Sequence, residues 1–423
     1  MSPKFSFKVS LIISAFKFNF MPTDFKKLLC ARFLFTFAVQ MQAVVLGWRI
    51  YELLKDPLYL GFIGLTEAVP AIGLALYAGY LVDRARPLLI YRRVMFVSLI
   101  SGLVVLSEHL FALNFPLGLQ VGLLYSAAFL TGIARSFSQP AIYAAVPRLV
   151  DRKNLMQASA LASSAMQVAR IAGPAFGGLV FGFFGAIASS TIVCLLLLIG
   201  SFSMLLIRKD VAPSSVQPQH ASITDELFSG LRFVFKHPIL FPALSLDMIS
   251  VLFGGVTALL PIFANEILFV GPKGLGILRA APAIGATIMS LYLSRTKTLR
   301  TGGWLLSSVF CFGLCILVFG VSRNFYLSLF ALALSGSFDS ISMAIRSAAV
   351  QLTSPDHMRG KISAVNSIFI GSSNEIGELE SGIAARLLGT VPAVYFGGVA
   401  CLCTVAVITY LSPALRSMDL KKF

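Results

Sequence analysis

The sequence contains little charge. Acidic and basic residues make up 12% of its 423 residues, about half of the roughly 25% that a soluble domain usually carries. Apolar residues account for 57%, far more than a disordered protein contains. These proportions exclude a soluble enzyme, a disordered tail protein and a fibrous repeat. They indicate that the protein is surrounded by a lipid bilayer.

Residues that build disulfides, metal sites and nucleotide sites are also scarce. The six cysteines lie in apolar stretches without a Cys-x-x-Cys pair, and the four histidines are scattered, so we expect no disulfide framework and no metal site. No segment matches the phosphate-binding loop of nucleotide hydrolases, and we expect no cofactor. The net charge of +16 is not gathered into a dense basic run, which argues against nucleic acid as a partner.

Twelve apolar stretches follow one another along the chain. Each is long enough for a helix that spans a bilayer, which needs about 20 residues. They lie at 28–52, 58–81, 89–111, 117–140, 155–183, 186–207, 239–265, 273–294, 303–321, 325–348, 360–385 and 392–412. The sequence therefore predicts an all-α membrane protein with twelve transmembrane helices.

Lysine and arginine gather in alternate loops between these stretches. The loop after the second stretch holds Arg84 and Arg86, and the loop after the sixth holds Arg208 and Lys209, whereas the intervening loops hold few basic residues. Basic loops stay in the cytoplasm. We therefore expect a multi-pass protein of the inner (plasma) membrane with both termini in the cytoplasm.

Three segments lie outside the apolar stretches. Residues 1–21 form an extension with two interpretations: an interfacial helix, or a misassigned start of translation. Residues 208–237 read as a cytoplasmic linker with an amphipathic helix, because Ile223, Leu227, Leu231 and Phe235 recur every four residues; a plain extension of the seventh span is the alternative. Residues 416–423 form a cytoplasmic tail.

The two halves of the sequence resemble each other. Pro70-Ala71-Ile72-Gly73 recurs as Pro282-Ala283-Ile284-Gly285, and Gly132 falls on Gly336 in a similar register. Because further matches follow in order, the simplest account is a duplicated unit of six spans. We expect two pseudo-symmetric six-helix bundles, at 22–207 and 238–415.

Two motifs carry a resemblance to a known family. Gly79-x-Leu81-x-Asp83-Arg84, after the second span, resembles the loop motif of the major facilitator superfamily. Gly173-Pro174-x-x-Gly177-Gly178, in the fifth span, resembles that superfamily's antiporter motif, which is found chiefly in exporters. The resemblance covers about residues 22–415. Within the superfamily, stretches such as Gly47-Trp48-Arg49-Ile50-Tyr51 resemble the enterobactin-exporter and macrolide-efflux-like branch.

The resemblance implies roles for both motifs. Gly79, Asp83 and Arg84 would form a gate that latches the two halves together on the cytoplasmic side; an ordinary solvated loop is the alternative. Gly173, Pro174, Gly177 and Gly178 would form a bent, tightly packed helix that closes the outer side; packing alone is the alternative. The superfamily's first, fourth, seventh and tenth helices line a central cavity.

Charged residues inside the spans are the remaining candidates, because each costs at least a few kcal/mol at the bilayer centre. The substrate-cavity candidates are Gln40, Glu67, Arg135, Arg279 and Arg346. The proton-coupling candidates are Asp247, Asp339, Glu375 and Glu378. The repeat places Arg135 at the position of Asp339 and Glu67 at that of Arg279, so we expect opposite charges to pair across the cavity. Static ion pairs between helices are the alternative.

These observations favour a secondary transporter that works by alternating access. We expect a monomeric, proton-coupled exporter of a small amphiphilic compound, such as a siderophore or a drug, because a carboxyl group in a medium of low dielectric can take up and release a proton. The alternatives are an importer or lysophospholipid transporter of the same fold, and a membrane scaffold or sensor without transport. An enzyme is not expected, because a Ser/His, paired-Asp or metal constellation is missing.

The loop charges predict the topology. Reporter tags at either terminus or within 208–220 should all report a cytoplasmic location in intact cells. A periplasmic signal from the 208–220 position would contradict the twelve-span arrangement.

Overall fold

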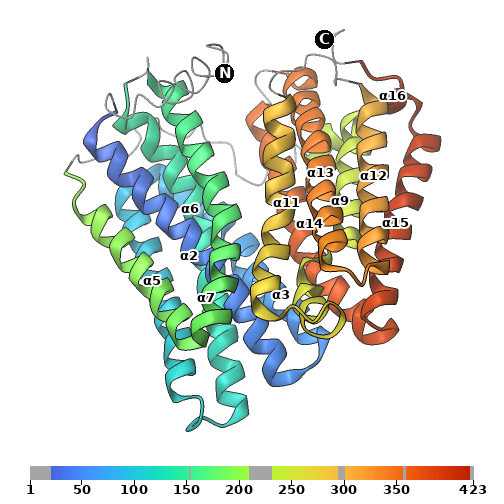
Figure 1. The fold of residues 1–423 in the computed structure, drawn as a ribbon. Coiled ribbons are helices and arrows are strands. Elements are labelled where there is room, and N and C mark those ends of the chain that lie inside the picture. The colour runs from blue at the N-terminus through green and yellow to red at the C-terminus, as the bar shows by residue number, and fades with distance from the viewer. Residues whose placement is uncertain (1–20, 152–153, 209–230, 294–300, 356–358, 420–423) are drawn as a thin grey trace, which may run out of the picture.

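The computed structural model describes residues 21–151, 154–208, 231–293, 301–355 and 359–419. The predicted N-terminal extension and most of the predicted linker helix lie outside these residues. The described residues form two groups of helices that stand side by side (Figure 1). The prediction of an all-α membrane protein is confirmed.

The N-terminal half contains five long helices and one short one. They are α2 (Thr23–Leu54), α3 (Pro57–Gly73), α4 (Ala75–Arg84), α5 (Pro87–Phe111), α6 (Leu117–Leu149) and α7 (Leu155–Leu205). Pro57 and Pro87 each stand at the first position of a helix, where their missing N–H leaves no hydrogen bond unmade. Asp56 caps α3 by accepting a hydrogen bond of 2.9 Å from the Leu58 amide.

The C-terminal half begins with a broken span. The stretch predicted as one helix at 239–265 is divided into α9 (Leu240–Gly254), η3 (Val256–Leu259), α10 (Leu260–Ile262) and the π-helical η4 (Phe263–Ile267). The break lies at Gly255, whose φ of −77° and ψ of 80° are not helical. The half continues with α11 (Gly271–Leu293), α12 (Gly302–Val321), α13 (Phe325–Thr353), α14 (Arg359–Leu388), α15 (Thr390–Leu411) and α16 (Pro413–Arg416).

The lengths of these helices are consistent with twelve spans. Among the described residues, nine segments are long and apolar enough to cross a membrane. One of them, α7, has 51 residues and would be about 77 Å long as a single helix, more than twice the roughly 30 Å of a bilayer core. It is divided at Gly185, whose φ of 81° is reached easily only by glycine. Together α3 and α4 cover the predicted second span, and α14 covers the eleventh.

Three clusters of buried apolar side chains hold the molecule together. The first lies within the N-terminal half and includes Phe35 and Tyr91, and another lies within the C-terminal half and includes Leu305. The third joins Trp48 of the N-terminal half to Phe263 of the C-terminal half. The halves therefore share a core only near the end of α2, and they diverge toward the end of the molecule where α16 lies (Figure 1).

The internal repeat is visible in the packing. In the N-terminal half, a Cβ atom at Gly132 would collide with the backbone of Glu67 and the ring of Pro70. In the C-terminal half, a Cβ atom at Gly336 would collide with the backbone of Pro282. In both bundles the repeated glycine therefore packs against the helix that carries the Pro-Ala-Ile-Gly sequence, at positions one turn apart.

The halves contact each other through two pairs of glycines. A Cβ atom at Gly178 of α7 would lie 2.5 Å from Cα of Gly276 in α11. A Cβ atom at Gly382 of α14 would lie 3.0 Å from Cα of Gly61 in α3. Small residues at helix crossings let backbones approach closely within a membrane, so these two contacts set the distance between the halves.

The contact at Gly178 can be tested by adding a side chain. Gly178→Val should lower the melting temperature of the purified protein, because overpacking a tight contact costs about 1–3 kcal/mol. The matched control is Gly122→Val in α6, where a Cβ atom would meet no described atom within 4 Å; it should shift stability by no more than about 0.5 kcal/mol. Equal melting temperatures for the two variants would contradict the contact.

Candidate functional site

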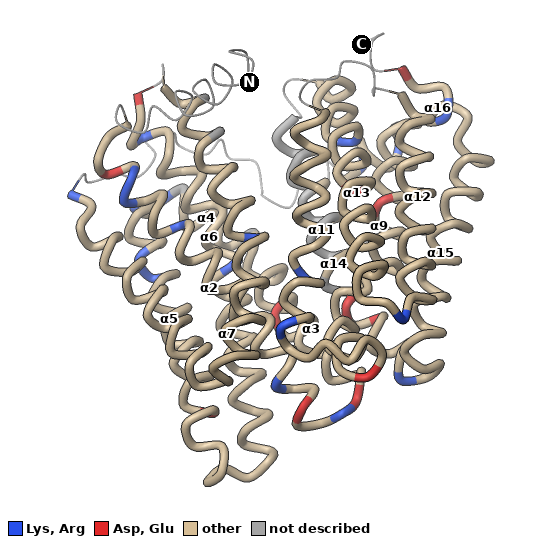
Figure 2. The backbone as a smooth tube through the Cα atoms, viewed as in Figure 1, with Lys and Arg blue, Asp and Glu red and all other residues tan. Residues whose placement is uncertain are grey.

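Four charged residues meet where the two halves join, and we call them the junction cluster. Glu67 of α3 and Arg135 of α6 come from the N-terminal half, and Arg279 of α11 and Glu378 of α14 come from the C-terminal half. The closest pair is Arg135 Nη1 and Glu67 Oε1, at 2.5 Å. Arg279 interacts electrostatically with Glu378 and Glu67, and Glu378 also interacts with Arg135. Figure 2 shows acidic and basic residues around α3, between the halves.

Glycines position Glu378 at this junction. Gly64 lies one turn before Glu67 on α3, and a Cβ atom there would be 2.5 Å from the Glu378 carboxylate. On the other side of α14, a Cβ atom at Gly377 would be 2.9 Å from the carbonyl oxygen of Leu252 in α9. The backbone of α14 is thus held between α3 and α9, and the Glu378 side chain extends from one half onto a helix of the other.

The charges inside the cluster balance. Two carboxylates from Glu67 and Glu378 face two guanidinium groups from Arg135 and Arg279, and each half supplies one charge of each sign. Balanced pairing offsets much of the cost of removing charges from water. Any change in protonation or in the distance between the halves would disturb this balance.

The expected pairing of Arg135 with Asp339 is wrong. Arg135 pairs with Glu67 of its own half, because α3 and α6 cross closely at Gly132. Asp339 lies instead in a separate pocket within the C-terminal half. Glu67 and Arg279 both belong to the junction cluster, and a pairing between them across the halves stays a prediction.

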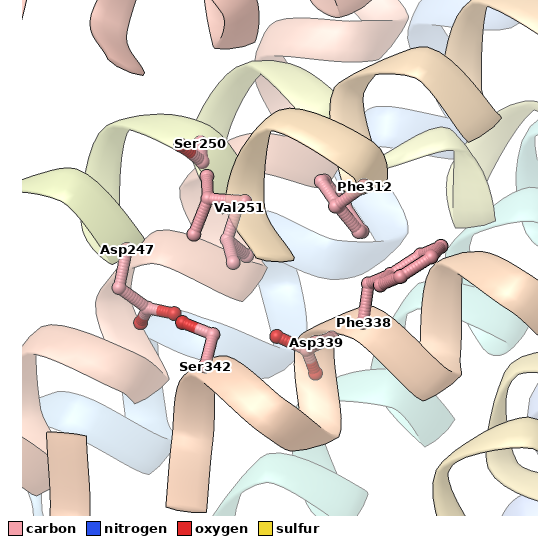
Figure 3. Close-up of a pocket in the computed structure, with 8 residues that line it drawn as sticks. Asp247, Ser250, Val251, Phe312, Phe338, Asp339 and Ser342 are labelled. Carbon is pink, nitrogen blue, oxygen red and sulfur yellow. The ribbon is translucent and has the colours of Figure 1, made fainter. Parts of the chain in front are cut away.

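The separate pocket, which we call the C-half pocket, lies between α9, α12 and α13 (Figure 3). It is lined by Asp247, Ser250, Val251, Val309, Phe312, Phe338, Asp339 and Ser342. Asp247 forms an ion pair with Arg346, which lies one turn beyond Ser342 on α13 and is 2% exposed. The structure thus brings three predicted residues together, Asp247, Asp339 and Arg346.

The antiporter-like motif packs on two sides. Gly173 and Gly177 face α2, where Cβ atoms would lie 2.8 Å from Gln40 Cβ and 2.9 Å from Met41 Cγ. Gly178 faces α11, and the carbonyl oxygen of Pro174 lies against Gly276 of that helix. The motif therefore places a helix of the N-terminal half in direct contact with the C-terminal half.

The loop motif is not packed against the other half in this structure. A Cβ atom at Gly79 would meet no described atom within 4 Å. The Arg84 guanidinium lies 4.4 Å from the centre of the Tyr80 ring, within its own helix α4. The side chains of Asp83 and Glu375 lie outside the part of the structure that is described.

Sequence reasoning missed a buried polar group near the end of α5. Glu108 is fully buried and accepts hydrogen bonds of 3.1 and 3.0 Å from Nε and Nη2 of Arg49. The neighbouring His109 Nδ1 lies 2.6 Å from the Ser190 hydroxyl. The sequence contains a signal for this group, because the polar residues Glu108 and His109 interrupt an apolar stretch. It pointed to Arg49 only through the family motif.

Metal ligands do not gather in the described residues. No group of three or more His, Cys, Asp or Glu residues in these ranges could hold a metal ion. All six cysteines are free thiols.

Comparison with known proteins identifies the family. Residues 18–422 match the family described as transmembrane secretion effector, within the major facilitator group. The enterobactin exporter EntS of Escherichia coli O1:K1 is 27% identical over 277 residues, which cover 64% of this chain and 62% of the exporter. The matched part is thus about three fifths of that relative's length.

Solved transporters share the fold. A bacterial homologue of the iron transporter ferroportin, in an inward-facing state, superposes with a TM-score of 0.72 at 16% identity, covering 92% of this chain and 98% of that one. A POT family transporter bound to a thioalcohol-conjugated peptide has a TM-score of 0.72 at 12% identity, covering 92% and 96%. This chain is a multi-pass membrane transporter that belongs to the transmembrane secretion effector family of the major facilitator superfamily.

Proposed function

We propose that this protein exports a small amphiphilic compound, such as a siderophore or a drug, across the inner membrane in exchange for protons. The junction cluster carries the proposal, because it joins titratable acids and fixed positive charges from both halves at the place where the halves meet. The similarity to the enterobactin exporter EntS supports export as the direction. Arg135 and Arg279 suit a partly anionic substrate.

The contacts between the halves support alternating access. At the end opposite α16, Tyr51 donates a hydrogen bond to Glu266, and Arg386 Nε lies 3.6 Å from Asp56 Oδ2. Lys273 Nζ of α11 also lies 3.4 Å from the centre of the Phe183 ring of α7. These contacts lock one end, whereas the loop motif at Gly79 is unpacked at the other. We assign this structure to a state that is open toward the cytoplasm.

Glu378 is the strongest of the four coupling candidates. Its carboxylate lies against α3 and interacts with charges of both halves, so protonation would remove one negative charge from a balanced cluster. The two arginines would then hold an excess of positive charge, so protonation would change which placement of the halves is preferred. Proton and substrate are exchanged if each favours a different placement of the halves. Asp247, Asp339 and Glu375 remain candidates for the same role.

Two other functions would use the same fold. An importer, including a lysophospholipid transporter, would accumulate substrate in the opposite direction. A scaffold or sensor would keep the junction cluster as a static set of ion pairs. The two experiments below separate these functions from proton-driven export.

Transport direction can be measured in everted membrane vesicles with an acidic interior. A radiolabelled panel of catecholate siderophores and amphiphilic drugs should yield at least one compound that accumulates inside, because protons leaving the vesicle drive the exporter's substrate inward. Collapsing the pH gradient should abolish the accumulation. Uptake that is equal in vesicles without the protein for every compound would argue for the scaffold.

Coupling can be tested with amide substitutions that keep shape and remove titration. Glu378→Gln should lose pH-driven accumulation while it still exchanges substrate between equal concentrations. The matched control, Glu380→Gln on the same helix, should keep both activities. Asp247→Asn, Asp339→Asn and Glu375→Gln are compared in the same assay. Normal pH-driven transport by all four variants would contradict proton coupling through these acids.

A further inference from the structure

The C-half pocket presents oxygen atoms on one side and apolar groups on the other. Figure 3 shows the side chains of Asp247 and Ser342 pointing toward one another, with the Asp339 carboxylate nearby, one turn earlier on α13. Figure 3 shows Phe312 of α12 and Phe338 of α13 on the other side, and Val309 of α12 also lines the pocket. A carboxylate from α9 and a carboxylate and a hydroxyl from α13 therefore converge from two helices.

One of these groups lacks a partner in the described structure. The Ser342 hydroxyl is buried, with 3% of the residue exposed, and no described atom hydrogen-bonds to it. A buried polar group without a partner costs about 1–3 kcal/mol, and such groups in folded proteins generally bind something. The oxygen atom of the Ser342 hydroxyl is thus available to coordinate a bound ligand.

The charges on the described side chains around the pocket do not balance. Asp247 and Asp339 supply two negative charges, and Arg346, paired with Asp247, supplies one positive charge. The sum is one net negative charge in an apolar bundle, where uncompensated charge is costly. The other lining residues from α9, α12 and α13 carry no charge, and the nearby titratable group from α15 is the Cys401 thiol beside Ser250. One monovalent cation would restore neutrality, whereas a divalent cation would leave an excess positive charge.

The size of the pocket also indicates an ion. The space open to the centre of a water-sized sphere is about 10 Å³, roughly what a single water molecule needs. The pocket therefore suits one occupant of atomic size and is too small for a drug-sized ligand. Carboxylate and hydroxyl oxygens are the ligands that hard cations prefer.

We propose that the C-half pocket binds a monovalent hard cation, Na⁺ in the cell, through Asp247, Asp339 and Ser342. A proton on Asp339 would neutralise the same charge, so Na⁺ and protons compete for the pocket. This site lies within one half of the molecule and shares no residue with the junction cluster. Its occupancy is independent of which substrate the protein exports.

The test is equilibrium binding of ²²Na⁺ to the full chain, purified in detergent, at pH 8 and constant ionic strength in choline chloride. Saturable binding of one Na⁺ per protein is expected in the unchanged protein. Asp339→Asn should abolish it. Ser342→Ala should weaken it by about tenfold, the equivalent of one lost contact to a charged group.

The matched control is Ser335→Ala, two turns earlier on α13, where the hydroxyl donates a 2.8 Å hydrogen bond to Leu332 within its own helix. It should bind Na⁺ normally. Lowering the pH from 8 to 6 should weaken Na⁺ binding, because protons compete. Size-exclusion profiles and melting temperatures in choline verify that each variant is folded.

Three results would overturn the proposal. The first is the absence of saturable ²²Na⁺ binding to folded protein. The second is unchanged Na⁺ binding by Asp339→Asn. The third is an equal loss of Na⁺ binding in Ser342→Ala and Ser335→Ala. Stabilisation by low pH alone, without any effect of Na⁺, would identify a site for protons only. Because the measurement involves no transport, its failure would leave proton-driven export through Glu378 untouched.

Discussion

The need to compensate buried charge determines how these helices are arranged. A carboxylate or guanidinium group among apolar helices must find a counter-charge or lose its own charge. Arg49 and Glu108 hold α2 against α5, and Asp247 and Arg346 hold α9 against α13. The junction cluster differs from both pairs, because its charges come from both halves. Its balance therefore depends on how the halves are placed, as does that of the Arg386–Asp56 pair, and we propose the cluster as the site for coupling.

Glycines make that dependence possible. The contacts of Gly178 with Gly276 and of Gly382 with Gly61 bring the halves close at one end without interlocking side chains. Helices that cross at glycines can move against one another at a lower free-energy cost than helices whose side chains interdigitate. In the antiporter-like motif, Gly173 and Gly177 pack against α2, whereas Gly178 packs against α11 of the other half.

The sequence predicts the helices better than it predicts their partners. The lengths of the apolar stretches predicted where the spans lie. The repeated Pro-Ala-Ile-Gly sequence predicted that corresponding helices pack in a similar way in both bundles. The break of the seventh span at Gly255 and the partner of Arg135 were not predicted, because each depends on how closely neighbouring helices pack. Helical spacing shows which residues share a face of one helix, but it does not show which helix that face meets. The Arg49–Glu108 pair escaped notice for the same reason.

The central claim is that the two halves open alternately at their two ends under control of the junction cluster. Spin labels in a cysteine-free background can measure both ends by pulsed electron resonance. One pair, at the exposed positions Leu205 and Leu352, reports the open end, and another, at Leu113 and Phe269, reports the locked end. The account predicts that lowering the pH, or Glu378→Gln at fixed pH, changes the two distances in opposite directions. Two distance distributions that stay fixed under both changes would contradict it.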